Sequence, residues 1–107
     1  MTTHPIDRLF AAIEARKDAD PTVSYTAKLI SEGREKCAKK LGEEAVETTL
    51  AAVGGKPAAL VAESADLMYH LLVLWSDAHV LPAEVWAELA RREGVLGLAE
   101  KLARREE

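Results

Sequence analysis

Residues 41–75 read LGEEAVETTLAAVGGKPAALVAESADLMYHLLVLW. They contain two acidic pairs, each with i, i+3 spacing: Glu44 with Glu47, and Glu63 with Asp66. On a helix this spacing puts both carboxylates of a pair on one face. Between the pairs, Gly54-Gly55-Lys56-Pro57 is typical of one helix ending and another beginning. The stretch therefore predicts an antiparallel helical hairpin.

The two acidic pairs are expected at the same height in this hairpin. Glu47 precedes Val53 by six residues and Glu63 follows Pro57 by six, roughly 9 Å of helix in each case. Carboxylates that face each other repel strongly unless a cation lies among them. An all-oxygen site suits Mg²⁺ or Mn²⁺. The predicted metal ligands are Glu44, Glu47, Glu63 and Asp66.

A solvated charged face is the alternative interpretation of each acidic pair. Lys40 precedes Glu44 by four residues and could pair with it. However, Glu44 projects from an apolar side of its helix, between Leu41 and Thr48, where a lone carboxylate is costly to desolvate. A second acidic pair at the matching height also favours the metal site.

Composition limits the classes of protein to which the chain could belong. Of its 107 residues 49% are hydrophobic but only 5% aromatic, which favours closely packed helices in a single domain, residues 1–107. A net charge of −4 argues against a nucleic-acid partner. A single cysteine, Cys37, fits a reducing compartment. With no signal-like segment, and with Leu71–Trp75 as the longest apolar run, we expect a cytoplasmic protein without a membrane partner.

Apolar periodicity and capping residues predict helices throughout, with no strand pattern. The expected helices are Pro5 to about Lys17 capped by Thr3 or His4, Ser24–Ile30 closed by Gly33, Arg34–Val53, Pro57–His79, a helix from Pro82 to before Gly94, and a short helix or frayed tail at Gly97–Arg105.

Two of these helices have broad apolar surfaces. In Arg34–Val53, Cys37 and Leu41 lie nearly opposite Val46 and Leu50, so neighbours are expected on both sides. The fold predicted is all-α, with an antiparallel helical hairpin that completes a four-helix-bundle core by dimerisation.

A basic cluster precedes the acidic pairs in an otherwise acidic chain, and it consists of Lys28, Arg34, Lys36, Lys39 and Lys40. These residues could form a solvated face. Beside a divalent metal they would suit a polyphosphate, because ammonium and guanidinium groups bind the phosphates. His70 lies one turn after Asp66, where it could contact substrate or hydrogen-bond a neighbour.

Several motifs resemble a known family. ExxE followed by ExxD is the pattern of the all-α MazG-like NTP pyrophosphohydrolase superfamily. The segments that resemble its phosphoribosyl-ATP pyrophosphohydrolase family, from histidine biosynthesis, are SYTAKLI (24–30) with Gly33, KKLGEEAVE (39–47) and ADLMYHLLVLW (65–75). The resemblance covers roughly Ile6 to Arg92, and its mild departures at Leu41, Met68 and Cys37 remove no predicted ligand.

The resemblance implies Mg²⁺-dependent hydrolysis of 1-(5-phosphoribosyl)-ATP to 1-(5-phosphoribosyl)-AMP and pyrophosphate. Glu43 or Glu47 would then activate the attacking water. The substrate contacts would be Ser24, Tyr25, Lys28, Arg34, Lys39 and Lys40. The homodimer or higher homo-oligomer is expected from the apolar helices and not from the resemblance.

Two other functions fit the same residues less well. A housekeeping (d)NTP pyrophosphohydrolase would share the metal cluster, but the SYTAKL segment favours the histidine-pathway family. A non-catalytic helical dimerisation module would use the acidic pairs only to solvate the hairpin.

Overall fold

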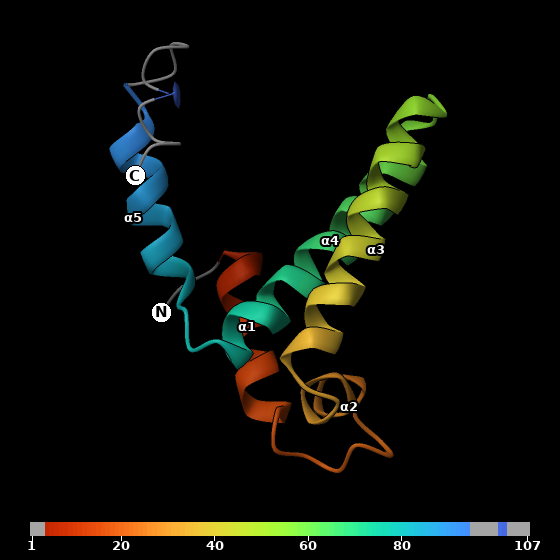
Figure 1. Ribbon diagram of the computed structural model, residues 1–107, viewed down its shortest axis with the longest axis vertical. Helices are drawn as coiled ribbons and strands as arrows, with labels where there is room; N and C mark the ends of the chain where they lie inside the picture. Colours follow the sequence, from red (N-terminus) through yellow and green to blue (C-terminus); the bar gives the residue numbers. More distant parts are fainter. Residues whose placement is uncertain (1–3, 95–100, 103–107) are drawn as a thin grey trace.

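The computed structural model describes residues 4–94 and 101–102, and every regular element in these ranges is helical. The helices are α1 (Pro5–Arg16), α2 (Tyr25–Ser31), α3 (Arg34–Val53), α4 (Pro57–Asp77) and α5 (Pro82–Arg92) (Figure 1). The all-α class is therefore confirmed, with small differences at helix ends. Most of the helix or tail predicted at Gly97–Arg105 lies outside the described residues.

Local sequence explains where these helices begin. The His4 ring accepts a hydrogen bond from the Ile6 amide at 3.1 Å, and Ser24 Oγ accepts one from the Ala27 amide at 3.1 Å. Both caps satisfy amides that the first helical turn leaves unpaired. Gly33 before α3 and Gly55 between α3 and α4 have φ of 100° and 75°, a region that favours glycine.

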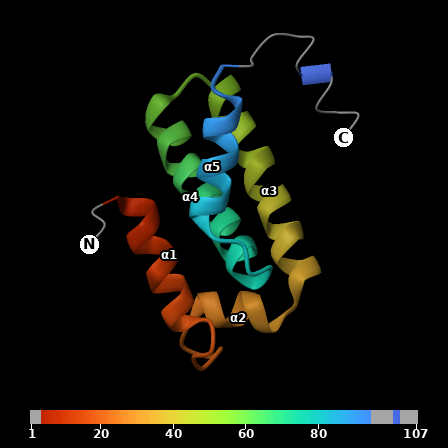
Figure 2. The ribbon, with the colours of Figure 1, turned by 90° about the vertical axis from the view of Figure 1, so that its left-hand side faces the viewer.

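The hydrophobic core lies at one end of the hairpin, where α1 and α2 pack against it (Figure 2). The buried apolar side chains there are Ile6, Phe10, Ile13, Ala27, Leu29, Cys37, Leu72 and Val73. The Trp75 and Trp86 rings meet edge to face with centroids 6.0 Å apart, which connects α5 to the end of α4. The other end of the hairpin projects beyond this core.

Within the described chain the main packing partners of α3 are α4 and α2, and apolar residues on another side of α3 are open to solvent. Val46, Leu50 and Val53 are 57%, 60% and 86% exposed. Val61 and Met68 of α4 are also exposed. The described residues therefore do not supply the neighbour predicted for this second side, and the four-helix core formed by dimerisation stays a prediction.

By length and composition alone α4 could cross a membrane, a property shared by core helices of soluble proteins. Glu63 and Asp66 lie within this helix, and charged residues are costly inside a bilayer. Its C-terminal half packs in the core through Leu72 and Val73, each 1% exposed. We therefore interpret α4 as a core helix.

Candidate active site

Thr48 fixes the register of the hairpin at the height of the acidic pairs. Its hydroxyl donates to the Glu44 carbonyl at 2.8 Å and also lies 3.2 Å from the Glu63 carbonyl on α4. This contact places the turn of α3 that carries Glu44 beside the turn of α4 that carries Glu63. Sequence reasoning missed this role, although Thr48 follows Glu44 by one turn.

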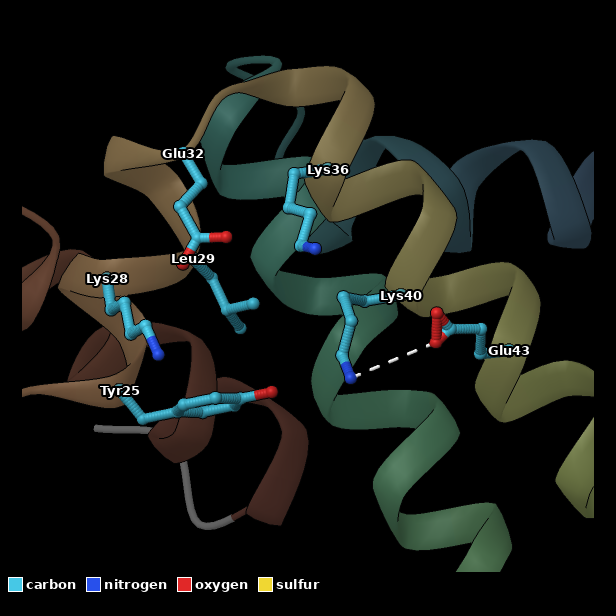
Figure 3. A pocket seen from close by; sticks show the side chains of 7 residues that line it. All are labelled: Tyr25, Lys28, Leu29, Glu32, Lys36, Lys40 and Glu43. Carbon is cyan, nitrogen blue, oxygen red and sulfur yellow. Dashed lines mark ion pairs between the residues drawn. The ribbon is translucent and has the colours of Figure 1, made fainter.

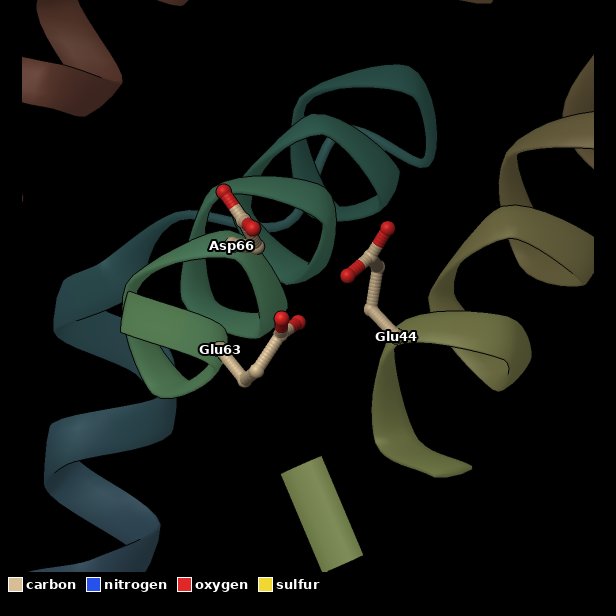
Figure 4. Close-up of side chains that lie close together, drawn as sticks. All are labelled: Glu44, Glu63 and Asp66. Atoms are coloured by element: carbon tan, nitrogen blue, oxygen red, sulfur yellow. The ribbon is translucent and has the colours of Figure 1, made fainter. Parts of the chain in front are cut away.

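Three of the four predicted metal ligands converge across the hairpin. Glu44, Glu63 and Asp66 each offer one oxygen, and these oxygens lie within 4.8 Å of one another. Figure 4 shows the Glu44 side chain reaching from α3 toward the two carboxylates of α4. Glu44 and Glu63 are partly buried, whereas Asp66 is exposed. Glu47 is exposed and is not part of this group, so its role as a ligand stays a prediction.

The carboxylates perturb one another electrostatically. Partial desolvation raises the pKa of Glu63, and the negative charges of Asp66, Glu44 and Glu47 raise it further. A divalent cation among these groups would relieve the repulsion. The donor atoms are all carboxylate oxygens from two helices held in fixed register, which suits a hard cation.

A cavity of about 220 Å³ lies between α2 and α3 (Figure 3). It is lined by Tyr25, Lys28, Leu29, Glu32, Lys36, Lys40 and Glu43. One of these lining residues, Glu43, directly precedes Glu44 of the carboxylate cluster in the sequence. Lys40 Nζ lies 3.9 Å from Glu43 Oε2, so Lys40 pairs with Glu43 rather than with Glu44. The cavity thus brings together predicted substrate contacts from two helices with Glu43, a predicted catalytic residue.

The other predicted substrate contacts lie away from this cavity. Ser24 caps α2, and Lys39 is exposed outside the cavity lining. Arg34 Nε donates to Asp77 Oδ2 at 2.8 Å and Nη2 donates to the Asp77 carbonyl at 3.0 Å. Arg34 therefore joins the start of α3 to the end of α4. Roles of these three residues in substrate binding stay predictions.

Lys36 lines the cavity but was not among the predicted substrate contacts, although the basic cluster included it. It precedes Lys40 by four residues and therefore lies on the same face of α3. This spacing could have identified Lys36 as a further substrate contact from the sequence alone. Glu32 could not be placed from spacing alone, because the break at Gly33 separates it from α3.

Two polar contacts hold α2 against α4 behind the cavity. His70 is buried, and its Nδ1 lies 2.9 Å from the Asp66 carbonyl. A carbonyl only accepts, so in the neutral ring Nε2 is free to accept from the Tyr25 hydroxyl at 3.4 Å. Thr26 Oγ1 and the Tyr69 hydroxyl lie 2.6 Å apart. His70 therefore connects the Asp66 turn to a side chain of the cavity wall.

A helical hairpin that gathers carboxylates from two helices beside a cationic cavity is the arrangement expected from the sequence resemblance to the all-α NTP pyrophosphohydrolases. Comparison with known proteins narrows this class. Residues 6–93 match the sequence model of the phosphoribosyl-ATP pyrophosphohydrolase family. The chain belongs to this family.

Several relatives resemble the chain over nearly its whole length. A phosphoribosyl-ATP pyrophosphatase of Azospirillum brasilense is 60% identical over 94% of the chain and 90% of the relative. Proteins of the same name from Parvibaculum lavamentivorans and Paramagnetospirillum magneticum are 59% and 57% identical. These alignments cover 94% and 92% of the chain, and 93% and 91% of the relatives.

Proposed function

We propose that this protein hydrolyses 1-(5-phosphoribosyl)-ATP to 1-(5-phosphoribosyl)-AMP and pyrophosphate in histidine biosynthesis, with Mg²⁺ as its metal. Membership of the family supports the substrate. The observation on which the proposal depends most is the convergence of Glu44, Glu63 and Asp66 within 4.8 Å. A triphosphate binds tightly to such a site only through a bridging cation, because carboxylates and phosphates repel.

Hydrolysis adds water across the α–β phosphoanhydride bond. The water oxygen forms a new bond to one of the two phosphorus atoms, and the bond between that phosphorus and the bridging oxygen breaks. Phosphoribosyl-AMP and pyrophosphate then separate, and one water proton passes to a base. Glu43 or Glu47 is proposed as this base. When bound, Mg²⁺ would neutralise charge on the phosphoryl oxygens. Lys40, beside Glu43 on the cavity wall, would add positive charge at the same end of the site.

We also propose that the protein works as a homodimer in the cytoplasm. The two helices of the hairpin carry five exposed apolar side chains, which are Val46, Leu50, Val53, Val61 and Met68. A second hairpin packed on these side chains would complete the predicted four-helix core. The free thiol of Cys37 is buried, which is compatible with a reducing compartment.

Pyrophosphate release by the purified protein tests the proposed reaction. With Mg²⁺ we expect rapid release from phosphoribosyl-ATP and much slower release from ATP and the common dNTPs. Faster turnover of a dNTP would instead support the housekeeping enzyme. No release from any of these nucleotides would support the non-catalytic module.

A further inference from the structure

The lysine cavity and the carboxylate cluster lie along one face of α3. Lys36, Lys40 and Glu44 follow one another at intervals of four residues, so their side chains project from the same side of the helix. Each interval spans roughly 6 Å of helix, which puts Lys36 roughly 12 Å from Glu44 along the axis. The cavity therefore continues the candidate metal site toward α2.

Positive charge in this cavity is poorly neutralised by the protein. In the described part of the chain, no carboxylate lies within 4.0 Å of the ammonium nitrogen of Lys28 or Lys36. Lys40 reaches Glu43 only at 3.9 Å. Glu32 and Glu43 also line the cavity, but three lysines leave an excess of one positive charge. Figure 3 shows the three lysines entering the cavity from two helices.

The size of the cavity limits what it can hold. Its volume of about 220 Å³ is below the roughly 300–1,000 Å³ of pockets that enclose a whole small ligand. It can therefore accept one end of a nucleotide substrate. Tyr25 and Leu29 supply an aromatic and an aliphatic wall, and such a wall suits the carbon skeleton of a sugar that carries the phosphate.

We propose that this cavity binds the 5′-phosphate of the ribose attached to the adenine of the substrate, and so selects phosphoribosyl-ATP over ATP. This inference rests on the proposed function. Adjacent phosphorus atoms of a triphosphate are closer together than one helical turn, so a triphosphate held at Glu44 can meet Lys40. Lys36 lies one helical turn further from Glu44 than Lys40 does, and we assign it, together with Lys28, to the second anionic group of the substrate, the 5′-phosphate of the ribose on the adenine.

Replacing Lys36 by Gln removes one charge of the cavity without touching the carboxylate cluster. In Lys36→Gln we expect KM for phosphoribosyl-ATP to rise about 10- to 100-fold, the usual effect of losing one hydrogen bond to a charged group. Calorimetry with ribose 5-phosphate should show a similar loss of affinity, while the affinity for pyrophosphate with Mg²⁺ changes less than about threefold. Lys28→Gln, on α2, should behave in the same way.

Lys56→Gln is the matched control. The substitution removes the same charge, but Lys56 is exposed at the start of α4, at the end of the hairpin away from the cavity. Equal losses for ribose 5-phosphate and pyrophosphate would overturn the inference, since the cavity would then bind the triphosphate end. Unchanged binding of both, or the same loss in Lys56→Gln, would overturn it as well. A separate measurement tests the proposed function: if the wild-type protein releases no pyrophosphate from phosphoribosyl-ATP, the proposed function is wrong.

Discussion

Divalent cations should stabilise the folded protein through the three converging carboxylates. If one ion binds only the native state, a metal concentration ten times Kd adds RT ln 11, about 1.4 kcal/mol. For a domain of about this size, 1 kcal/mol raises Tm by roughly 4–8 °C. We therefore expect Mg²⁺ or Mn²⁺ to raise Tm by roughly 6–11 °C at that concentration.

Glu44→Gln tests whether this stabilisation comes from the cluster. Glu44 is the only one of the three carboxylates contributed by α3. Losing it should weaken metal binding about tenfold or more, which reduces the shift to roughly 2–3 °C or less. Tm of the metal-free variant should rise, because Glu44 is one of the charges that repel Glu63.

Thermal unfolding at several metal concentrations, with pyrophosphate release measured in parallel, separates these effects. Glu35→Gln provides the control, because Glu35 is an exposed carboxylate in the first turn of the same helix. It should keep both the metal shift and the activity. The metal assignment would be refuted if Glu44→Gln retained the full metal shift, or if the wild-type protein showed none.

Three further predictions concern the rest of the molecule. Tyr69→Phe should lower stability by about 1–2 kcal/mol in chemical denaturation, because it leaves the buried Thr26 hydroxyl without its partner; a Thr26→Val, Tyr69→Phe double variant should recover part of this loss. Leu50→Glu should convert the proposed dimer to a monomer in sedimentation analysis, whereas Val23→Glu, at an 82% exposed position outside the hairpin, should not; a monomeric wild type would contradict the dimer. Hydrogen bonds from Arg91 and Arg92 lower the pKa of Glu88 to about 2 from an ordinary value of 4.5. The stabilisation from these bonds should be complete above pH 4.5 and disappear as the pH falls to about 2. Tm of Glu88→Gln should therefore depend less on pH in this window than Tm of the wild type, and the same pH dependence in both proteins would rule out this contribution.

Local sequence patterns were sufficient to predict the hairpin and the convergence of Glu44, Glu63 and Asp66, but not that Glu47 lies outside this group. The Gly54-Gly55-Lys56 connection is too short to allow anything but antiparallel neighbours, so counting residues from the turn sets the height of Glu47 and Glu63. The contact between Thr48 and the Glu63 carbonyl agrees with that count to within one residue. Helical spacing then determines which side chains face the interface.

Contacts between distant segments could not be predicted in this way. Arg34 was expected to bind phosphate as part of the basic cluster, yet its partner Asp77 lies 43 residues away. Nothing in the neighbourhood of either residue indicates that the start of α3 meets the end of α4. Tyr25 and His70, 45 residues apart, meet for the same reason. Charge type and spacing identify candidates for a site, but the packing of α2 on the hairpin decides which of them share it.

The two faces of α3 carry residues of different kinds. One face carries Lys36, Lys40 and Glu44 at helical spacing, and the other exposes Val46, Leu50 and Val53. The helices of the described residues leave the side chains of this second face exposed. The small core at the α1–α2 end holds only one half of the hairpin. In the proposed dimer, packing against the apolar face would hold Glu63 and Glu44 rigidly on the projecting half, and this would link the proposed assembly to the geometry of the predicted metal site.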